Sequence, residues 1–290
     1  MLVYLNGEFI QKEEARISVE DRGFVFGDGV YEVTRVVNGR LFEEEAHWRR
    51  LERGLRELEI DASAVIDRDR IREISERLLR ENDLTEGEAT VYLQVTRGTA
   101  VRTHWFPPAG TRATVYLSAS RFQIPADQRE NGVDAVTLPD IRWSRCDLKT
   151  VNLLGAVMAK QKAREAGAYD AVFIRDGAVT EGGAANVFVV LDGVLRTFPK
   201  SNYVLPGVTR DVIIELAGEL DIPIGEMPLF AHELDRVEEL FFTGTTTDVQ
   251  AIVRLDGKPV GDGRPGPIAR ALLEALYRRM GLGAEVPVGA

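Results

Sequence analysis

Strand patterns and amphipathic helix patterns alternate along the whole chain, and this alternation narrows the possible folds more than any other property of the sequence. A hairpin is predicted around Asn6–Gly7, and three further segments follow the two-residue period of strands: 30–37, 89–97 and 113–118. Residues 43–59 and 68–80 follow the period of amphipathic helices. Together these elements predict an α+β domain over residues 1–119.

The same mixture returns after a polar break. Residues 120–131 contain Pro125 and follow neither period, so they predict a linker between the domain at 1–119 and a second domain at 132–290. In the second domain the predicted strands are 133–138, 171–174, 186–191, 194–197, 239–242 and 249–255. The predicted helices are 153–166, 208–220 and 267–280.

The bulk composition excludes several classes of function. The 290 residues carry a formal net charge of −10, which repels nucleic-acid backbones and anionic membranes. No apolar run is long enough to span a bilayer, and residues 1–10 lack the basic start of a secretory signal. We therefore expect a cytoplasmic protein that binds neither nucleic acid nor membrane. The single cysteine, Cys146, and three histidines without ligand spacing predict no metal site.

Lysine is rare in this chain, and one lysine lies in an unusual place. Only six of the 36 basic residues are lysines, so arginine carries most of the positive charge. Lys149 immediately precedes the apolar helix predicted from residue 153. A desolvated lysine amine can act as a nucleophile and form an imine, which arginine cannot do. The alternative is a lysine at a helix start that keeps its charged end in water.

A second candidate is the carboxylate of Glu181 in the predicted turn at 180–186. A buried acid beside a pyridine nitrogen keeps that nitrogen protonated, as a pyridine cofactor requires. The small residues Gly182 to Ala185 allow the backbone to approach a flat ring closely. The alternative is a turn whose glutamate faces water.

Three places in the sequence are suited to hold a phosphate. Val208 and Thr209 begin a predicted helix, whose N-terminus offers free N–H groups to an anion. Thr245 lies in a threonine-rich turn after a predicted strand, and Arg50 offers a fixed positive charge. Taken singly, a helix cap, a strand-end turn and a solvated charge explain them equally well.

Arg102 and His104 form a possible carboxylate-binding pair on the loop after the strand at 89–97. Alternate residues of an extended segment point the same way, so both side chains can contact one carboxylate. A charged surface loop is the alternative.

The motifs together resemble the D-amino acid aminotransferases, which belong to the fold-type IV pyridoxal-phosphate enzymes. That class also contains branched-chain aminotransferases and aminodeoxychorismate lyase. The resemblance extends over nearly the whole chain. It is carried by residues 21–23, 26–33, 95–104, 140–149, 152–157, 180–182, 207–212 and 239–246.

This resemblance implies a role for each candidate residue. Lys149 would bind pyridoxal 5'-phosphate covalently and move the proton at the substrate α-carbon, while Glu181 would pair with the pyridine nitrogen. Leu205 would pack against the ring. Four residues would hold the phosphate: Arg50, Val208, Thr209 and Thr245. The substrate would be bound by Tyr31, Arg102 and His104.

The resemblance also implies a reaction and an assembly. The amino group of a D-amino acid, D-alanine, would pass through the cofactor to a 2-oxo acid, 2-oxoglutarate, in a homodimer whose active sites lie between the two domains. A branched-chain L-amino acid aminotransferase is the first alternative, because Leu205–Pro206–Gly207 is similar to those enzymes. An (R)-amine transaminase or an aminodeoxychorismate lyase follows. Arg102 and His104 favour the D-amino acid enzymes.

Two further expectations concern departures from the family pattern and the class of protein. Gly183, Ala184, Ala185 and Gly244 stand where hydroxyl side chains are common in the D-specific relatives, so backbone donors replace some hydroxyl contacts.

A cofactor-binding protein without turnover is the alternative from another class. The joint presence of Lys149, Glu181 and Tyr31 argues for an enzyme.

Overall fold

The computed structural model describes residues 1–283, which form two compact units. The first unit comprises Met1–Gln123 together with Leu148–Asn152. The second comprises Ile124–Asp147 and the chain from Leu153 onward. The chain therefore leaves the second unit for five residues and then returns to it. Lys149 is one of these five residues, so by its contacts it belongs to the first unit, whereas the sequence placed it in the second domain.

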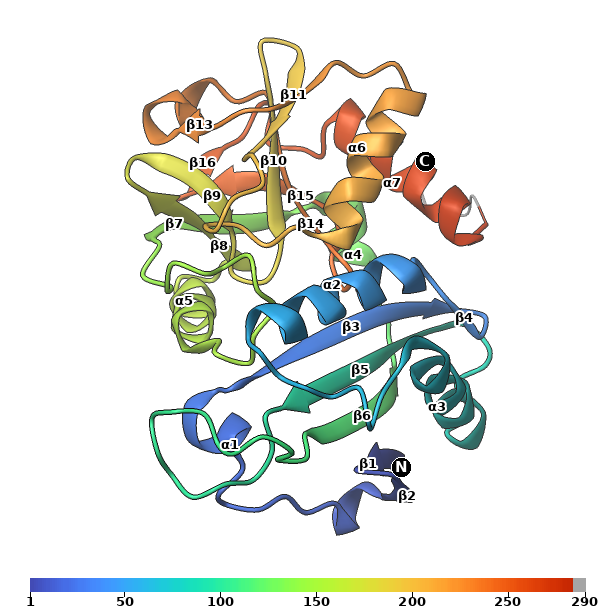
Figure 1. Ribbon diagram of the computed structural model, residues 1–290. Coiled ribbons are helices and arrows are strands. Elements are labelled where there is room, and N and C mark those ends of the chain that lie inside the picture. The colour runs from blue at the N-terminus through green and yellow to red at the C-terminus, as the bar shows by residue number, and fades with distance from the viewer. Residues whose placement is uncertain (284–290) are drawn as a thin grey trace. The chain divides into compact units, whose positions relative to one another are not determined.

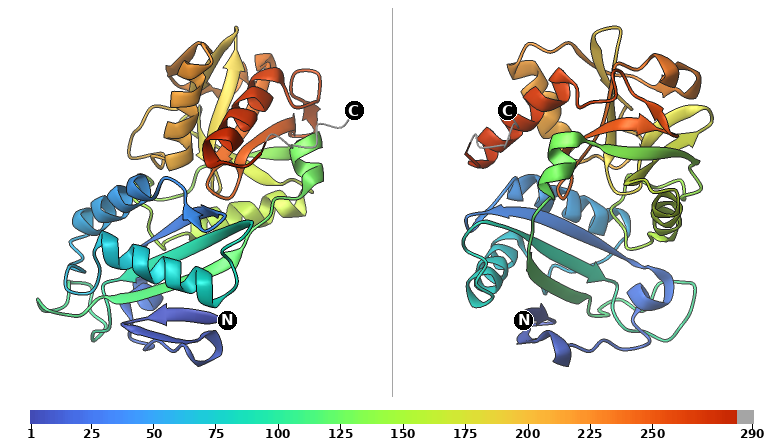
Figure 2. Two further views of the ribbon diagram at one scale, coloured as in Figure 1. Left: turned by 90° about the vertical axis from the view of Figure 1, so that its right-hand side faces the viewer. Right: turned by 180° about the vertical axis from the view of Figure 1, so that it is seen from behind.

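The first unit is built on an antiparallel six-stranded sheet in the order β2-β1-β6-β5-β3-β4. Its strands are β1 (Leu2–Leu5), β2 (Glu8–Gln11), β3 (Gly29–Val37), β4 (Arg40–Leu41), β5 (Glu88–Thr96) and β6 (Thr114–Arg121). Helix α2 (Glu44–Glu57) packs on β3, and α3 (Arg68–Glu81) packs on β6 and β1, so both helices cover one face of the sheet (Figures 1 and 2). Apart from the two-residue β4, these elements confirm the sequence predictions, with shifts of a few residues at their ends.

The alternation of residues along β3 explains why the helices cover only one face. Val30 and Val36 are buried in one apolar core with Leu51 and Leu55 of α2. Burying a leucine side chain stabilises such packing by about 2 kcal/mol. Gly54 allows α2 to lie close to the sheet, because a Cβ there would be only 3.0 Å from the Val30 side chain.

The second unit is built on a ten-stranded mixed sheet that closes on itself. Its strands are β7 (Val133–Pro139), β8 (Asp170–Arg175), β9 (Ala178–Gly182), β10 (Asn186–Leu191), β11 (Val194–Thr197), β12 (Ile224–Glu226), β13 (Leu229–Phe230), β14 (Glu239–Gly244), β15 (Asp248–Leu255) and β16 (Lys258–Pro259). The order β10-β14-β15-β7-β8-β9 returns to β10 through the pair Asn186↔Glu181. The helices are α4 (Ala126–Asn131), α5 (Leu154–Glu165), α6 (Val208–Glu219) and α7 (Pro267–Met280).

Several short elements differ from the sequence prediction. The segment 120–131 is not irregular throughout, because β6 continues to Arg121 and α4 occupies Ala126–Asn131. Helix α1 (Arg22–Phe26) was not predicted either, since five residues are too few to show a helical period. Its ends are marked instead by caps: the Asp21 side chain accepts from the Gly23 N–H, and Gly27 adopts a left-handed conformation.

The sequence placed Lys149 at the start of the following helix, but the structure places it in an extended segment before that helix. Helix α5 begins at Leu154, and the segment before it runs beside β3. Val30 and Thr150 form an isolated antiparallel bridge, and the Tyr31 N–H donates to the Lys149 carbonyl (2.9 Å). This pairing with a buried strand fixes the backbone of the lysine.

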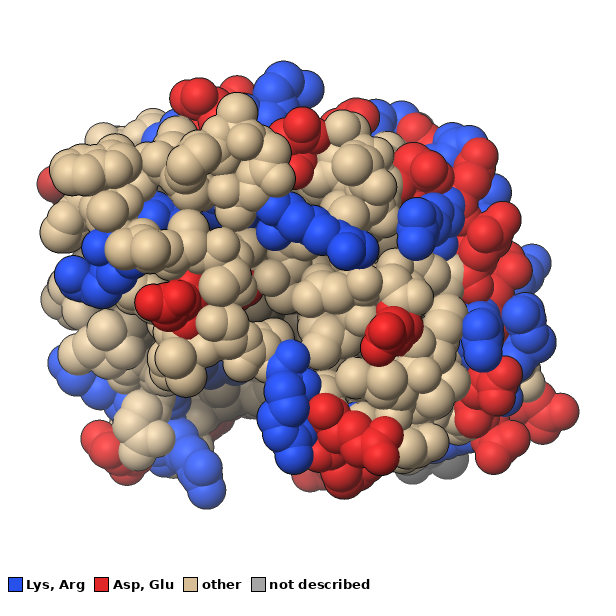
Figure 3. All heavy atoms as spheres, turned by 60° about the horizontal axis from the view of Figure 1, so that its bottom comes forward, with Lys and Arg blue, Asp and Glu red and all other residues tan. Residues whose placement is uncertain are grey.

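Charge on the surface is mixed in sign. On the face drawn in Figure 3, acidic and basic side chains are interspersed, and wide areas between them carry neither. Among residues 1–283, no helix combines the length and the apolar character that crossing a membrane requires.

Candidate active site

The amine of Lys149 lies over the ring of Tyr31, with 4.3 Å between Nζ and the ring centre. Tyr31 in turn stacks on Tyr92, and Tyr92 contacts Tyr116, so β3, β5 and β6 present a row of tyrosines on one face. Burial, followed by the neighbouring tyrosines, raises the pKa of Tyr92 to about 12. Tyr92 therefore stays uncharged at neutral pH, and the row offers the half-buried lysine an aromatic surface.

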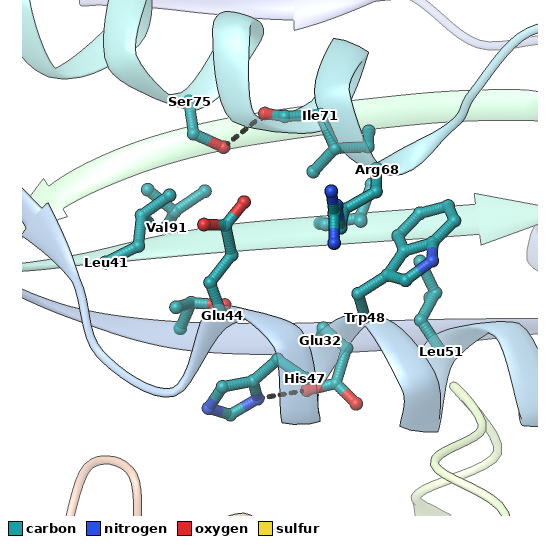
Figure 4. A pocket seen from close by; sticks show the side chains of 12 residues that line it. Glu32, Leu41, Glu44, His47, Trp48, Leu51, Arg68, Ile71, Ser75 and Val91 are labelled. Atoms are coloured by element: carbon teal, nitrogen blue, oxygen red, sulfur yellow. Dashed lines mark hydrogen bonds and ion pairs between the residues drawn. The ribbon is translucent and has the colours of Figure 1, made fainter.

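Arg50 is held by a buried carboxylate on the opposite face of the same strand. Its Nε donates to Oε1 of Glu32 (2.7 Å) and its Nη2 donates to Oε2 (2.8 Å). His47 Nδ1 also lies 2.8 Å from Oε2, and both His47 and Arg50 come from α2. Figure 4 draws the contact between His47 and Glu32 as a dashed line. A bidentate carboxylate fixes the plane of a guanidinium. The predicted phosphate ligand is thus oriented before any ligand binds.

The ionisation of this group follows from its surroundings. Burial alone would raise the pKa of Glu32, but the charge and hydrogen bonds of Arg50 and the hydrogen bond with His47 outweigh it and hold that pKa below its ordinary value. Burial lowers the pKa of His47, against the influence of Glu32. Glu32 is therefore ionised, and His47 is neutral with its Nδ1 proton donated to the carboxylate. The cavity drawn in Figure 4 measures about 30 Å³, too small for a cofactor.

Glu181 lies inside β9 and not in the turn where the sequence suggested it, because the turn occupies residues 183–185. Its Oε1 accepts from Nη1 of Arg142, and its Oε2 accepts from the Asn186 amide (3.1 Å) and the Leu205 N–H (2.9 Å). The pair Glu181↔Asn186 closes the sheet, so the acid is buried among strands on both sides.

Burial raises the pKa of Glu181, and the Arg142 guanidinium opposes that shift. Arg142 itself is fixed by Asp140, which accepts from both its Nε and its Nη2 (2.8 Å each). Asp140 also accepts from Arg175 (3.1 Å). A protonated group nearby, such as a pyridinium, favours the charged form of a buried carboxylate further. The surroundings of Glu181 are therefore suited to a cationic ring nitrogen.

Helix α6 begins close to this carboxylate. Gly207 is its N-cap and offers no side-chain cap, and Val208 and Thr209 are buried in its first turn. A Cβ on Gly207 would overlap with Oδ1 of Asn186, so only glycine allows the helix start to approach the residue that holds Glu181. An uncapped helix N-terminus is suited to an anion by its N–H groups and its dipole.

The strand next to Asn186 contributes a polar edge. Thr243 on β14 pairs with Asn186, and Thr245 lies half-buried in the turn that follows β14. Among the described residues, the Thr243 hydroxyl is one of a few buried polar side-chain atoms without a hydrogen-bond partner. Buried hydroxyls normally have partners. An orphaned hydroxyl, an uncapped helix start and an acid with a raised pKa together fit a phosphorylated pyridine.

Arg102 and His104 are both exposed, and both approach the ring of Phe26 in α1. The Arg102 Cζ lies 5.2 Å from the ring centre, and the His104 ring centre lies 5.8 Å from it. The structure thus brings the predicted carboxylate pair together on one aromatic side chain. In residues 1–283 no group of three or more His, Cys, Asp or Glu side chains is gathered as metal ligands.

The stretch from β3 to β15, which contains most of these residues, is the part of the chain that matches a known family. The profile of the family Amino-transferase class IV matches residues 29–255. The chain belongs to this family. The aminotransferase is 40% identical over 276 residues to D-alanine aminotransferase of Staphylococcus aureus (strain COL), a match that covers 95% of this chain and 96% of the relative. It is also 40% identical over 278 residues to D-alanine aminotransferase of Bacillus licheniformis, with the same coverage.

Solved structures agree with this family. The branched-chain amino acid aminotransferase of Escherichia coli has a TM-score of 0.89 at 28% identity, covering 96% of this chain and 93% of that one. The branched-chain aminotransferase of the archaeon Thermoproteus uzoniensis, solved with norvaline, has a TM-score of 0.86 at 26% identity, covering 99% and 97%. The predicted fold type IV is confirmed. The protein is a pyridoxal-phosphate-dependent aminotransferase, as the sequence indicated.

Three residues of the arrangement were missed by sequence reasoning. Glu32 had a visible signal, because it is a charged residue at a core-facing position of an alternating strand. Arg142 and Asn186 gave no local signal, since their importance comes from contacts with Glu181, 39 and 5 residues away along the chain. Leu205 was predicted to touch the ring, and its backbone N–H is also a partner of Glu181.

Proposed function

We propose that this aminotransferase moves the amino group of a D-amino acid, D-alanine, to 2-oxoglutarate. The observation that carries this proposal is the pair Arg102 and His104, which approach one Phe26 ring on a loop of the first unit. Two adjacent donors match the two oxygens of a substrate carboxylate. The curated relatives named above support the same substrate, since they are D-alanine aminotransferases at 40% identity over nearly the full chain.

Each residue of the proposed cofactor site has one role in this proposal. Lys149 attaches the cofactor and transfers the proton at the substrate α-carbon, and Tyr31 hydrogen-bonds beside it. Glu181, which accepts a hydrogen bond from Arg142, holds a proton on the ring nitrogen, and Leu205 packs on the ring. The phosphate is held by four residues: Arg50, Val208, Thr209 and Thr245. Pyridoxal phosphate supplies an aldehyde that accepts the amino group and a ring that delocalises the electrons of the α-carbon.

The proposal includes a homodimer in the cytoplasm. Leu154, Val157 and Met158 are 68%, 58% and 45% exposed and recur at the spacing of one face of α5. An exposed apolar helix face is typical of an interface. A second copy of the chain is the proposed partner.

A paired substrate panel tests the reaction. The holoenzyme is assayed with D-alanine, L-alanine and L-leucine, each with 2-oxoglutarate as acceptor. We expect turnover of D-alanine and at least roughly 100-fold lower kcat/KM for both L-amino acids, a difference of about 2.7 kcal/mol in transition-state stabilisation. Faster turnover of L-leucine would assign the branched-chain activity instead.

The variant Arg102→Ala/His104→Ala tests whether these two loop residues bind the substrate carboxylate. It should raise KM for D-alanine at least about tenfold, because two donors to the carboxylate are lost. An unchanged KM in this variant would remove the observation on which the substrate assignment rests.

A further inference from the structure

We propose that helix α1 is the platform that sets the spacing of Arg102 and His104, with Phe26 and Arg22 as positioning residues. The inference rests on the proposed function, because it assigns how the carboxylate pair of that function is held. It concerns only residues of the first unit.

Phe26 is the ring on which three positively charged or aromatic side chains meet. The Cζ atoms of Arg22 and Arg102 lie 4.7 and 5.2 Å from its centre, and the His104 ring lies 5.8 Å away. A guanidinium within about 6 Å of an aromatic ring centre is attracted by the electrons of the ring face. Phe26 therefore contacts both members of the pair.

Arg22 holds the backbone on both sides of His104. Its Nη1 donates to the carbonyls of Thr103 (2.9 Å) and Trp105 (3.4 Å). Its own position is fixed, because Arg22 is 4% exposed and its Nε donates to Asp28 (2.7 Å). A buried guanidinium that binds the residues before and after His104 determines where that side chain leaves the loop.

Asp28 joins this anchor to the base of the loop. Its carboxylate also accepts from Nε and Nη2 of Arg97 (2.8 and 3.0 Å), the residue at which the loop departs from β5. The Arg97 guanidinium in turn lies 3.7 Å from the ring centre of Phe106, beyond the pair. The loop is thus tied before, within and after the pair, while Arg102 and His104 themselves are exposed.

This fixation has a chemical purpose. An exposed arginine samples many rotamers, and ordering it on binding costs free energy. Two donors grip one carboxylate only when their separation matches its two oxygens. A platform that contacts both side chains lowers this cost, so its loss should weaken substrate binding without altering the chemical step.

The test compares two phenylalanines of the same helix. Phe26→Leu removes the ring, Phe26→Tyr keeps it, and Phe24→Leu is the control, since Phe24 is 70% exposed. In the holoenzyme we expect Phe26→Leu to raise KM for D-alanine about two- to fivefold, with kcat within about twofold of the parent. Phe26→Tyr and Phe24→Leu should leave KM unchanged. Equal KM values for Phe26→Leu and Phe24→Leu would overturn the proposal.

A double-mutant cycle separates this inference from the proposed function. In the Arg102→Ala/His104→Ala background, Phe26→Leu should cause no further rise in KM, because the side chains it positions are absent. If Arg102→Ala/His104→Ala leaves KM unchanged, the proposed function fails. If that variant raises KM but Phe26→Leu acts equally in both backgrounds, only the platform fails.

A second variant and a structural readout cover the case in which Phe26→Leu does not fold. Arg22→Lys keeps a positive charge, but a single amine cannot replace both Nε, which donates to Asp28, and Nη1, which donates to the two loop carbonyls. It should therefore raise KM for D-alanine as Phe26→Leu does. Hydrogen exchange of the cofactor-free protein should show faster exchange in residues 99–106 for Arg22→Lys than for Phe24→Leu. Parent-like exchange and KM in Arg22→Lys would also overturn the proposal.

Discussion

The buried carboxylates Glu32 and Glu181 have pKa shifts of opposite direction although burial acts on both in the same way. Glu32 accepts two hydrogen bonds from Arg50 and one from His47, which outweigh burial. Glu181 accepts only one hydrogen bond from a guanidinium, that of Arg142, and its other donors, Asn186 and the Leu205 N–H, are uncharged, so burial dominates. The first acid is therefore a permanent anion that orients Arg50. The second gains from any further positive charge, such as a protonated ring nitrogen.

Replacing Glu32 by glutamine should destabilise the cofactor-free protein in a pH-dependent way. Because the folded pKa of Glu32 is lowered from 4.5, its stabilisation is complete above about pH 4.5 and is lost as the pH falls further. At pH 7 we expect a loss of about 3 kcal/mol in the free energy of unfolding, since Arg50 loses its buried partner. Urea unfolding at about pH 7 and about pH 4 measures this.

The loss should be smaller at the lower pH than at the higher one. The control is Glu81→Gln, because Glu81 is a half-exposed acid whose partner, Arg77, lies on the same helix. That change should alter stability by less than about 0.5 kcal/mol. A Glu32→Gln loss of equal size at both pH values would contradict the assignment.

At the scale of elements, the start of α6 is the proposed phosphate site, and Gly207 allows it to lie close to Asn186, the partner of Glu181 on β9. Gly207→Ala should lower the affinity for pyridoxal phosphate at least about tenfold, because the added Cβ displaces either Asn186 or the first turn of the helix. Gly218→Ala in the same helix is the matched control, since a Cβ there meets nothing within 4 Å. Cofactor titration measures both, and equal affinities would show that the approach of the helix start is unimportant.

The long elements were predictable from the sequence because each buries one face. The strands β3 and β5 and the helices α2 and α3 show their period directly. Strand β9 was missed because three of its five residues are Thr, Glu and Gly, so the segment shows neither an alternating pattern nor an apolar run although all five are buried. Most candidate residues were proposed individually from their chemical type, and Tyr31 and Leu205 from the family resemblance alone. Two of their partners were not. Arg142 is defined by its contact with Glu181, 39 residues away, and Glu32, although its charge at a core-facing position is visible, by its contacts with α2.

At the scale of the whole molecule, the exposed face of α5 predicts that the protein is a dimer. Light scattering of the parent protein should give the mass of two chains. Leu154→Glu/Val157→Glu should give one chain, because charges replace the apolar contact. Leu220→Glu, at an exposed leucine just beyond α6, is the control and should leave the mass unchanged. A parent protein with the mass of one chain would contradict the dimer.

The closed sheet of the second unit has a consequence for biosynthesis. Glu181 and Asn186 complete a ring of strands that also needs β14 and β15, and β15 pairs with β7, which lies far earlier in the chain. While a ribosome is still translating, that ring stays open until residue 255 has emerged. The ring of strands around Glu181, the residue proposed to pair with the vitamin B6 derivative, therefore forms only after most of the polypeptide has been made.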